Sequence, residues 1–83
     1  MTYKIAFKKS VARDLKKIGR KQSTKILDKI ERELPTKADK CPELKGQFSR
    51  LRKCRIGDYR IIFTIINDTV IIARIRHRKE IYK

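Results

Sequence analysis

The chain has 83 residues, so we expect a single domain over residues 1–83 with no room for a second one. Its formal net charge of +15 makes self-repulsion costly and indicates a surface that binds a polyanion, most commonly a nucleic acid. The cations are interleaved with apolar residues along the whole chain, which favours a folded basic domain over a disordered arm. With no signal peptide and no apolar run near about 18 residues, the sequence predicts a cytoplasmic protein that does not span a membrane.

The N-terminal half predicts a strand followed by two helices. Apolar and polar residues alternate over residues 3–8, as in a half-buried strand. Ser10 is then a plausible N-cap for a helix that ends at Gly19. Apolar residues at helical spacing over 26–34 predict a second helix, ended by Pro35. The two helices are expected to form an antiparallel hairpin.

The C-terminal half is rich in β-branched residues. After a loop or a broken turn at residues 36–42, two-residue turns separate three predicted strands, at 48–56, 59–66 and 69–76. The order β-α-α-β-β-β predicts an α+β fold, with the helical hairpin packed on one face of a twisted, mostly antiparallel four-stranded sheet. The opposite face of the sheet is then free for function.

The two cysteines, Cys41 and Cys54, lack the spacing of a metal site, so no metal is predicted. Cys54 reads as an apolar strand residue and Cys41 as a loop residue. A disulfide between them is the alternative, which a reducing cytosol disfavours.

The first hairpin turn places two arginines face to face. A two-residue turn at Gly57-Asp58 sets Arg55 opposite Arg60 on one face of the sheet, with Lys53 two residues back on the same face. Like charges directly opposite one another destabilise a sheet, so the sequence predicts an anion site here. The alternative is that the long side chains splay into water.

The second hairpin leaves two registers open. A regular two-residue turn sets Arg60 opposite Ile75 and puts His77 on its face, whereas a bulge or a longer turn brings in Arg76 instead. In either register residues 76–78 end close to the arginine pair. His77 is the only histidine and a candidate base.

These residues favour metal-free cleavage of RNA. The sequence has no carboxylate cluster, no glycine-rich phosphate loop and no Ser-His-Asp set, and no cofactor is implied. Arginine, lysine, histidine and tyrosine suffice when the ribose 2′-hydroxyl attacks the adjacent phosphate. Tyr82 is a candidate for proton transfer or for stacking on a base, with a role as core anchor as the alternative.

Three stretches resemble the RelE/ParE toxin superfamily: Leu44-Lys45-Gly46, then Arg55-Ile56-Gly57-Asp58-Tyr59-Arg60, then His77-Arg78 with Tyr82 four residues on. The resemblance covers essentially the whole chain. It implies a toxin with a compact α/β fold, and RelE-like members cut mRNA in the ribosomal A site and leave a 2′,3′-cyclic phosphate. It also implies an acidic, RelB-like antitoxin as partner.

The resemblance assigns roles to individual residues. Arg60 matches the strongest active-site arginine, Tyr82 the C-terminal tyrosine, and Arg76 or Arg78 the C-terminal arginine. The candidate catalytic residues are therefore Arg60, Arg78, Tyr82, His77 and Arg55. The candidate phosphate-binding residues are Lys53, Arg55, Arg52 and Arg76.

Some features depart from the family pattern. Ser49-Arg50 stands where many relatives have an aromatic residue, and no glutamate matches the base of the YoeB-like branch. Two other functions compete with the nuclease: a ParE-like inhibitor of DNA gyrase, and a non-catalytic RNA- or ribosome-binding protein. ParE-like members generally lack the C-terminal arginine and tyrosine, so Arg78 and Tyr82 favour the nuclease.

Overall fold

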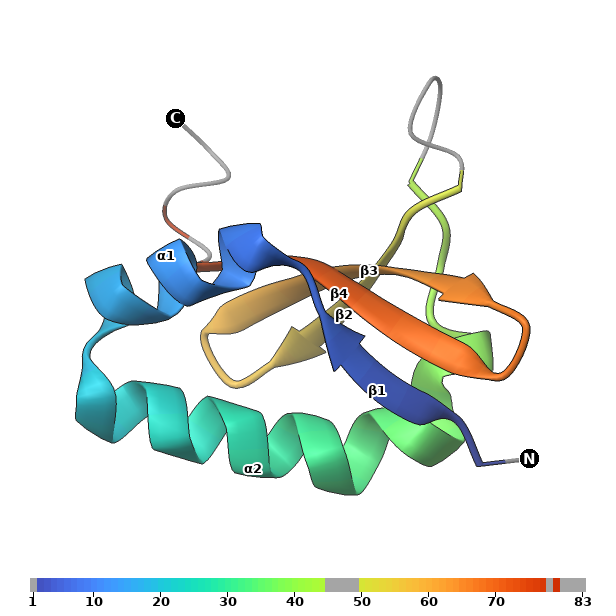
Figure 1. Ribbon diagram of the computed structural model, residues 1–83, viewed down its shortest axis with the longest axis horizontal. Helices are drawn as coiled ribbons and strands as arrows, with labels where there is room; N and C mark the ends of the chain where they lie inside the picture. The colour runs from blue at the N-terminus through green and yellow to red at the C-terminus, as the bar shows by residue number, and fades with distance from the viewer. Residues whose placement is uncertain (1, 45–49, 78, 80–83) are drawn as a thin grey trace.

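Four strands form one mixed sheet in the order β1-β4-β3-β2, with β1 parallel to β4 and the other neighbours antiparallel (Figure 1). The computed structural model describes residues 2–44, 50–77 and 79. Its elements are β1 (Lys4–Phe7), α1 (Lys9–Ile18), α2 (Arg20–Lys37), the 3₁₀ helix η1 (Ala38–Lys40), β2 (Arg52–Ile56), β3 (Tyr59–Ile66) and β4 (Thr69–His77). The predicted α+β class and the β-α-α-β-β-β order are confirmed.

The hydrophobic core lies between α2 and one face of the sheet (Figure 1). Ile30 and Leu34 of α2 and Phe63, Val70 and Ile72 of the central strands are fully buried there. Alternate residues of the strands point to the opposite face, which neither α1 nor α2 covers (Figure 1). The core therefore orients the sheet and leaves one face free to carry the polar residues of a site.

Helix α1 lies along the edge of β4, and its Val11 belongs to the same hydrophobic core as α2, so the predicted packing of the helical hairpin on the sheet is confirmed. Strand β1 pairs with β4 only as far as Ile72. Beyond that point the Ser10 hydroxyl donates to the carbonyl oxygen of Ala73 at 2.6 Å, and the Asp14 carboxylate accepts from the N–H of Ile75 at 3.0 Å. Side chains of α1 thus satisfy the edge of β4 where its neighbouring strand ends.

Ser10 is consequently not the N-cap of α1. The helix starts at Lys9 after Lys8, which makes no side-chain cap hydrogen bond. The prediction was wrong because the hydroxyl of Ser10 serves the sheet edge instead of its own helix. Gly19, with a φ of 96°, ends α1 as predicted and connects it to α2.

Helix α2 continues past Pro35 to Lys37, so the predicted helix end was wrong. Of the loop or broken turn predicted for residues 36–42, the structure has a short 3₁₀ turn, η1, directly after the helix. A proline in the last turn removes only one intrahelical hydrogen bond. Leu34 and Ala38, four residues apart, are fully buried and hold this turn against the core. No helix in the described part of the chain is both long and apolar enough to cross a membrane.

Strand β2 begins at Arg52 and not at residue 48. Arg52, its first residue, pairs with Phe63 of β3. Arg50 precedes the strand in a turn, and its carbonyl oxygen accepts a hydrogen bond from the Thr64 hydroxyl at 3.0 Å. Of the other residues in the predicted strand, 48 and 49 lie outside the described part of the chain. The turn at Gly57-Asp58 is confirmed, because Ile56 pairs with Tyr59.

Asp14 connects α1 to β4 through a buried ion pair. Its carboxylate accepts from Nε and Nη2 of Arg74, both at 2.9 Å, and its side chain is only 6% exposed. Burial alone would raise the pKa of Asp14. The hydrogen bonds from Arg74 and Ile75 and the charges of Arg74 and Arg76 outweigh that effect, so the pKa lies below its ordinary value of 3.8. The carboxylate therefore stays ionised at neutral pH.

We predict that Asp14→Asn lowers the free energy of unfolding by about 2 kcal/mol at pH 7, because it leaves the Arg74 guanidinium without its charge partner. The matched control is Asp28→Asn. Asp28 pairs with Arg32 on the exposed surface of α2, and its loss costs no more than about 0.5 kcal/mol. Urea denaturation of the three proteins measures the difference, and equal losses in the two variants would contradict the assignment.

The same ion pair predicts an acid dependence of stability. Since the pKa of Asp14 is lower in the folded chain than in the unfolded one, its stabilisation is complete above the unfolded value of about 3.8. It is lost as the pH falls through the folded value. Asp14→Asn should therefore flatten the decline of stability between about pH 5 and pH 2, as measured by urea denaturation at each pH. An unchanged slope would show that the Asp14 pKa is not lowered.

Candidate functional site

Three arginines lie in one row across the open face of the sheet. Arg60 on β3 pairs with Arg55 on β2 and with Arg76 on β4. Lys53 is two residues before Arg55 on β2 and therefore points to the same face. We call Lys53, Arg55, Arg60 and Arg76 the cation cluster. The predicted pairing of Arg55 with Arg60 is confirmed.

A bulge in β4 decides between the two registers that the sequence left open. The turn at 67–68 is regular, since Ile66 pairs with Thr69. The register then shifts between Ile62 and Phe63, whose partners are Arg74 and Ile72, so Ala73 is the extra residue. This shift moves Arg76 to the position opposite Arg60, where a regular hairpin would place Ile75.

His77 lies on the opposite face from the cation cluster, because it pairs with Tyr59 instead of Arg60. The two rings meet edge to face, with centroids 5.1 Å apart and an interplanar angle of 89°. The imidazole Nδ1 accepts a hydrogen bond from the backbone N–H of Lys79 at 3.2 Å. The structure therefore does not bring His77 to the row of arginines.

Arg52 is also held away from the cation cluster. It pairs with Phe63 of the core face, and its Nη1 donates to the carbonyl oxygen of Cys41 at 2.8 Å and of Asp39 at 3.4 Å. Its Nη2 forms an ion pair with Glu43 at 3.4 Å. These contacts fasten residues 39–43 to the start of β2, which is a structural role. The two remaining candidates, Arg78 and Tyr82, lie outside the described residues.

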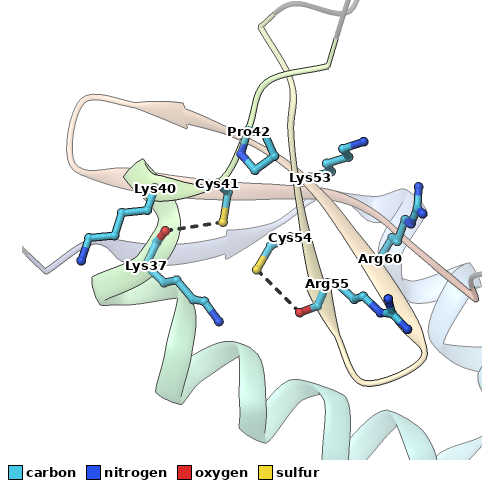
Figure 2. Close-up of a pocket in the computed structure, with 8 residues that line it drawn as sticks. All are labelled: Lys37, Lys40, Cys41, Pro42, Lys53, Cys54, Arg55 and Arg60. Atoms are coloured by element: carbon cyan, nitrogen blue, oxygen red, sulfur yellow. Dashed lines mark hydrogen bonds between the residues drawn. The ribbon is translucent and has the colours of Figure 1, made fainter.

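A pocket of about 420 Å³ lies beside β2 and receives part of the cation cluster. Figure 2 shows Lys53, Arg55 and Arg60 on one side of the strand, with Cys41 and Cys54 on the other. The lining residues are Lys37, Lys40, Cys41, Pro42, Lys53, Cys54, Arg55 and Arg60. Cationic groups thus border a floor of sulfur and carbon atoms, which suits a ligand with both a phosphate and an apolar surface.

Lys37 and Lys40 are the lining residues that sequence reasoning missed. They were predicted to lie in a loop or a broken turn, and only the continuation of α2 into η1 brings them next to β2. The signal available was the helical spacing of Leu34 and Ala38, both buried. If this spacing is given more weight than Pro35, the predicted helix extends far enough to bring both lysines next to β2.

Comparisons with known proteins agree on the family. The family described as the ParE toxin of the type II toxin-antitoxin system parDE matches residues 5–82. No curated protein matches the sequence at a significant level.

Solved structures of such toxins share the fold. The RelBE2 toxin-antitoxin complex from Mycobacterium tuberculosis contains a chain that is 23% identical, with a TM-score of 0.85, over 94% of this chain and 100% of that one. The RelB-RelE complex from Methanococcus jannaschii contains a chain that is 28% identical, with a TM-score of 0.64, over 93% of this chain and 94% of that one. A chain of the chromosomal ParDE system of Pseudomonas aeruginosa is 16% identical, with a TM-score of 0.68, over 92% of this chain and 96% of that one.

The match over nearly the whole chain, together with the fold, confirms the resemblance drawn from the arginine-containing hairpin. The neighbours include both RelE-type and ParE-type proteins, so the fold by itself does not choose between their activities. The chain belongs to the ParE toxin family within the RelE/ParE superfamily, and is a toxin of a type II toxin-antitoxin system.

Proposed function

We propose that this toxin is a metal-free endoribonuclease that cleaves mRNA in the ribosomal A site and thereby stops translation. The observation that carries the proposal is the row formed by Arg55, Arg60 and Arg76 across three adjacent strands. Like charges directly opposite one another repel, and an anion bound across the row relieves that repulsion and accepts charge-assisted hydrogen bonds from the guanidinium groups.

The central position of Arg60 suits it to the reacting phosphate. When the 2′-hydroxyl attacks, negative charge develops on the phosphate oxygens, and a guanidinium held in place stabilises that charge more than it stabilises the ground state. Arg55 and Arg76 flank Arg60 and would bind the same or the adjacent phosphate, with Lys53 further along the strand. Only RNA carries the attacking hydroxyl, which excludes DNA as substrate.

Proton transfer is assigned to the C-terminal residues. The resemblance to RelE-like toxins implies Tyr82 and Arg78 for this work, and we keep that assignment. His77 is a weaker candidate, because its ring stacks against Tyr59 on the other face of the sheet. Bound at the ribosome, the enzyme could also leave part of the proton transfer to ribosomal RNA.

An acidic antitoxin is the partner we propose for control of the toxin. The similar chains from M. tuberculosis and M. jannaschii were both solved in toxin-antitoxin complexes. A chain with a net charge of +15 gains stability when carboxylates bind next to its cations. Carboxylates placed on the cation cluster would occupy the positions of the RNA phosphates and so block cleavage.

Inhibition of DNA gyrase is the second candidate function. The observation in its favour is that the matching family is the ParE toxin family. In that case the cation cluster would contact a protein or DNA surface and perform no chemistry. The two functions differ in what accumulates in the cell, which is either cut mRNA or damaged DNA.

We predict that Arg60→Ala abolishes growth arrest and lowers mRNA cleavage by about 100-fold or more, as expected for removal of one charge-stabilising donor. Inducible expression followed by mapping of mRNA 5′ ends measures both effects. Arg32→Ala is the matched control, since it removes the same charge from the exposed surface of α2. Cuts within translated codons should appear with the wild type and this control alone.

Two outcomes would count against the assignment. Full arrest by Arg60→Ala would place the active site elsewhere. Arrest by the wild-type chain with DNA damage and without new mRNA ends would favour the gyrase inhibitor.

We also predict that Arg55→Gln and Arg76→Gln each weaken binding of a single-stranded 2′-O-methyl RNA, which cannot be cleaved by 2′-hydroxyl attack. Each variant should reduce the slope of log affinity against log salt concentration by about 0.7, the value for one lost phosphate contact in a single strand. Fluorescence anisotropy over a range of salt concentrations measures the slope. Arg32→Gln should leave it unchanged, and equal slopes in all variants would remove Arg55 and Arg76 from the phosphate site.

A further inference from the structure

The chain's two cysteines are neighbours in the fold although they are far apart in sequence. Cys41 follows η1 and Cys54 lies in β2, and each is only 6% exposed. Both are free thiols, and Cys54 is close enough to help raise the pKa of Cys41. Figure 2 shows the two sulfur atoms on the same side of β2, in the gap between that strand and the end of η1.

Two hydrogen bonds from the start of β2 hold the segments of the two cysteines together. The N–H of Lys53 donates to the carbonyl oxygen of Pro42 at 3.1 Å. The Arg52 guanidinium donates to the carbonyl oxygen of Cys41 at 2.8 Å. Each contact joins a residue next to one cysteine to the segment of the other, so the two Cα atoms cannot drift apart while β2 is formed.

The remaining contacts of the thiols are weak. The Sγ of Cys41 donates to the carbonyl oxygen of Lys37 at 3.5 Å, and the Sγ of Cys54 donates to that of Arg55 at 4.0 Å. Thiols are poor donors, so rotating the sulfur atoms toward one another costs little. Glu43 bridges Arg52 in antiparallel register, and extending this register by two residues brings Cys41 opposite Cys54. Opposite residues of antiparallel strands have Cα atoms within the range that a disulfide spans.

We propose that Cys41 and Cys54 form a redox site, a dithiol that an anionic low-molecular-weight disulfide such as oxidised glutathione converts into an internal disulfide. A thiolate of one cysteine attacks the small disulfide, forms a mixed disulfide and releases one small thiolate. The second cysteine, once deprotonated, attacks the protein sulfur and releases the other. The protein loses two electrons and two protons, and the small disulfide is reduced to two thiols.

The surroundings select an anionic reagent. The thiols line a pocket that also contains the cationic side chains of Lys37, Lys40 and Lys53. This positive charge attracts a negatively charged disulfide and repels a cationic one. The reaction is slow at neutral pH, because burial and the contact with Cys54 raise the pKa of Cys41 to about 12.

The disulfide would join the end of η1 covalently to the edge strand of the sheet. It closes a ring from residue 41 to residue 54 and connects the side of the pocket that carries Lys40 to the strand that carries Lys53 and Arg55. Such a ring stabilises the fold mainly by restricting the unfolded chain. The inference does not depend on the proposed nuclease activity.

The test is to incubate the purified full-length chain in glutathione redox buffers and to follow it by intact mass, non-reducing peptide mapping and thermal unfolding. We expect a monomer that has lost two hydrogen atoms, a cross-linked peptide pair containing both cysteines, and a Tm several degrees above that of the reduced chain. The rate should rise about tenfold from pH 7 to pH 8, as the thiolate fraction does. It should be several-fold lower with cystamine, a cationic disulfide, and added salt should reduce that difference.

Cys41→Ser and Cys54→Ser are the matched controls, and each should yield a mixed disulfide with glutathione and no redox-dependent Tm. Only mixed disulfides or intermolecular dimers in the wild-type chain would overturn the proposal. So would two free thiols in a buffer that oxidises the same chain unfolded in guanidinium, because the cysteines would then be inert core residues.

Discussion

The extra residue at Ala73 in β4 is the constraint on which the arrangement of the cations depends. It shifts the register so that Arg76, and not Ile75, lies opposite Arg60. The hydroxyl of Ser10 binds the carbonyl of Ala73 itself and the carboxylate of Asp14 binds the N–H of Ile75, where β1 no longer pairs with β4. Contacts of α1 at one edge of the sheet thus set which side chains appear together on its open face.

This arrangement of arginines lowers the stability of the fold and favours the binding of an anionic ligand. Arginines placed opposite one another on three strands repel, and the ionised Asp14, which pairs with Arg74, also lies within the field of Arg76. Binding of a polyanion reduces this repulsion, so its relief would add to the affinity for the proposed RNA substrate and the proposed acidic antitoxin. Part of the high net charge therefore belongs to the proposed binding site, and the rest is spread over the remaining surface.

Much of the fold could be predicted from the sequence because it depends on local patterns. Alternating and helical spacings indicated the element order, and the Gly57-Asp58 turn alone was enough to pair Arg55 with Arg60. The helix beyond Pro35 was missed, because burial of Leu34 and Ala38 outweighs the loss of one hydrogen bond. Local propensity carries no information about such tertiary contacts.

The candidate site was harder to predict for the same reason. Lys53, Arg55, Arg60 and Arg76 do share one face, whereas Arg52 and His77 point to the other. Strand alternation separates Arg52 from Lys53 and follows from the sequence once the strand is known. The choice between Arg76 and His77 required the bulge, which depends on contacts with α1 more than 60 residues earlier in the chain. Long-range contacts of this kind leave no signature in the spacing of residues.

Membership of the toxin family is established by the match over residues 5–82, and the central proposal is that the row of arginines supports cleavage of RNA by its 2′-hydroxyl. The most direct measurement is the terminal group of the RNA fragments that accumulate when the chain is expressed. Attack by the 2′-hydroxyl predicts fragments with a 2′,3′-cyclic phosphate at the upstream 3′ end and a 5′-hydroxyl downstream. Fragments with a 3′-hydroxyl and a 5′-phosphate, or growth arrest without any fragments, would contradict the account.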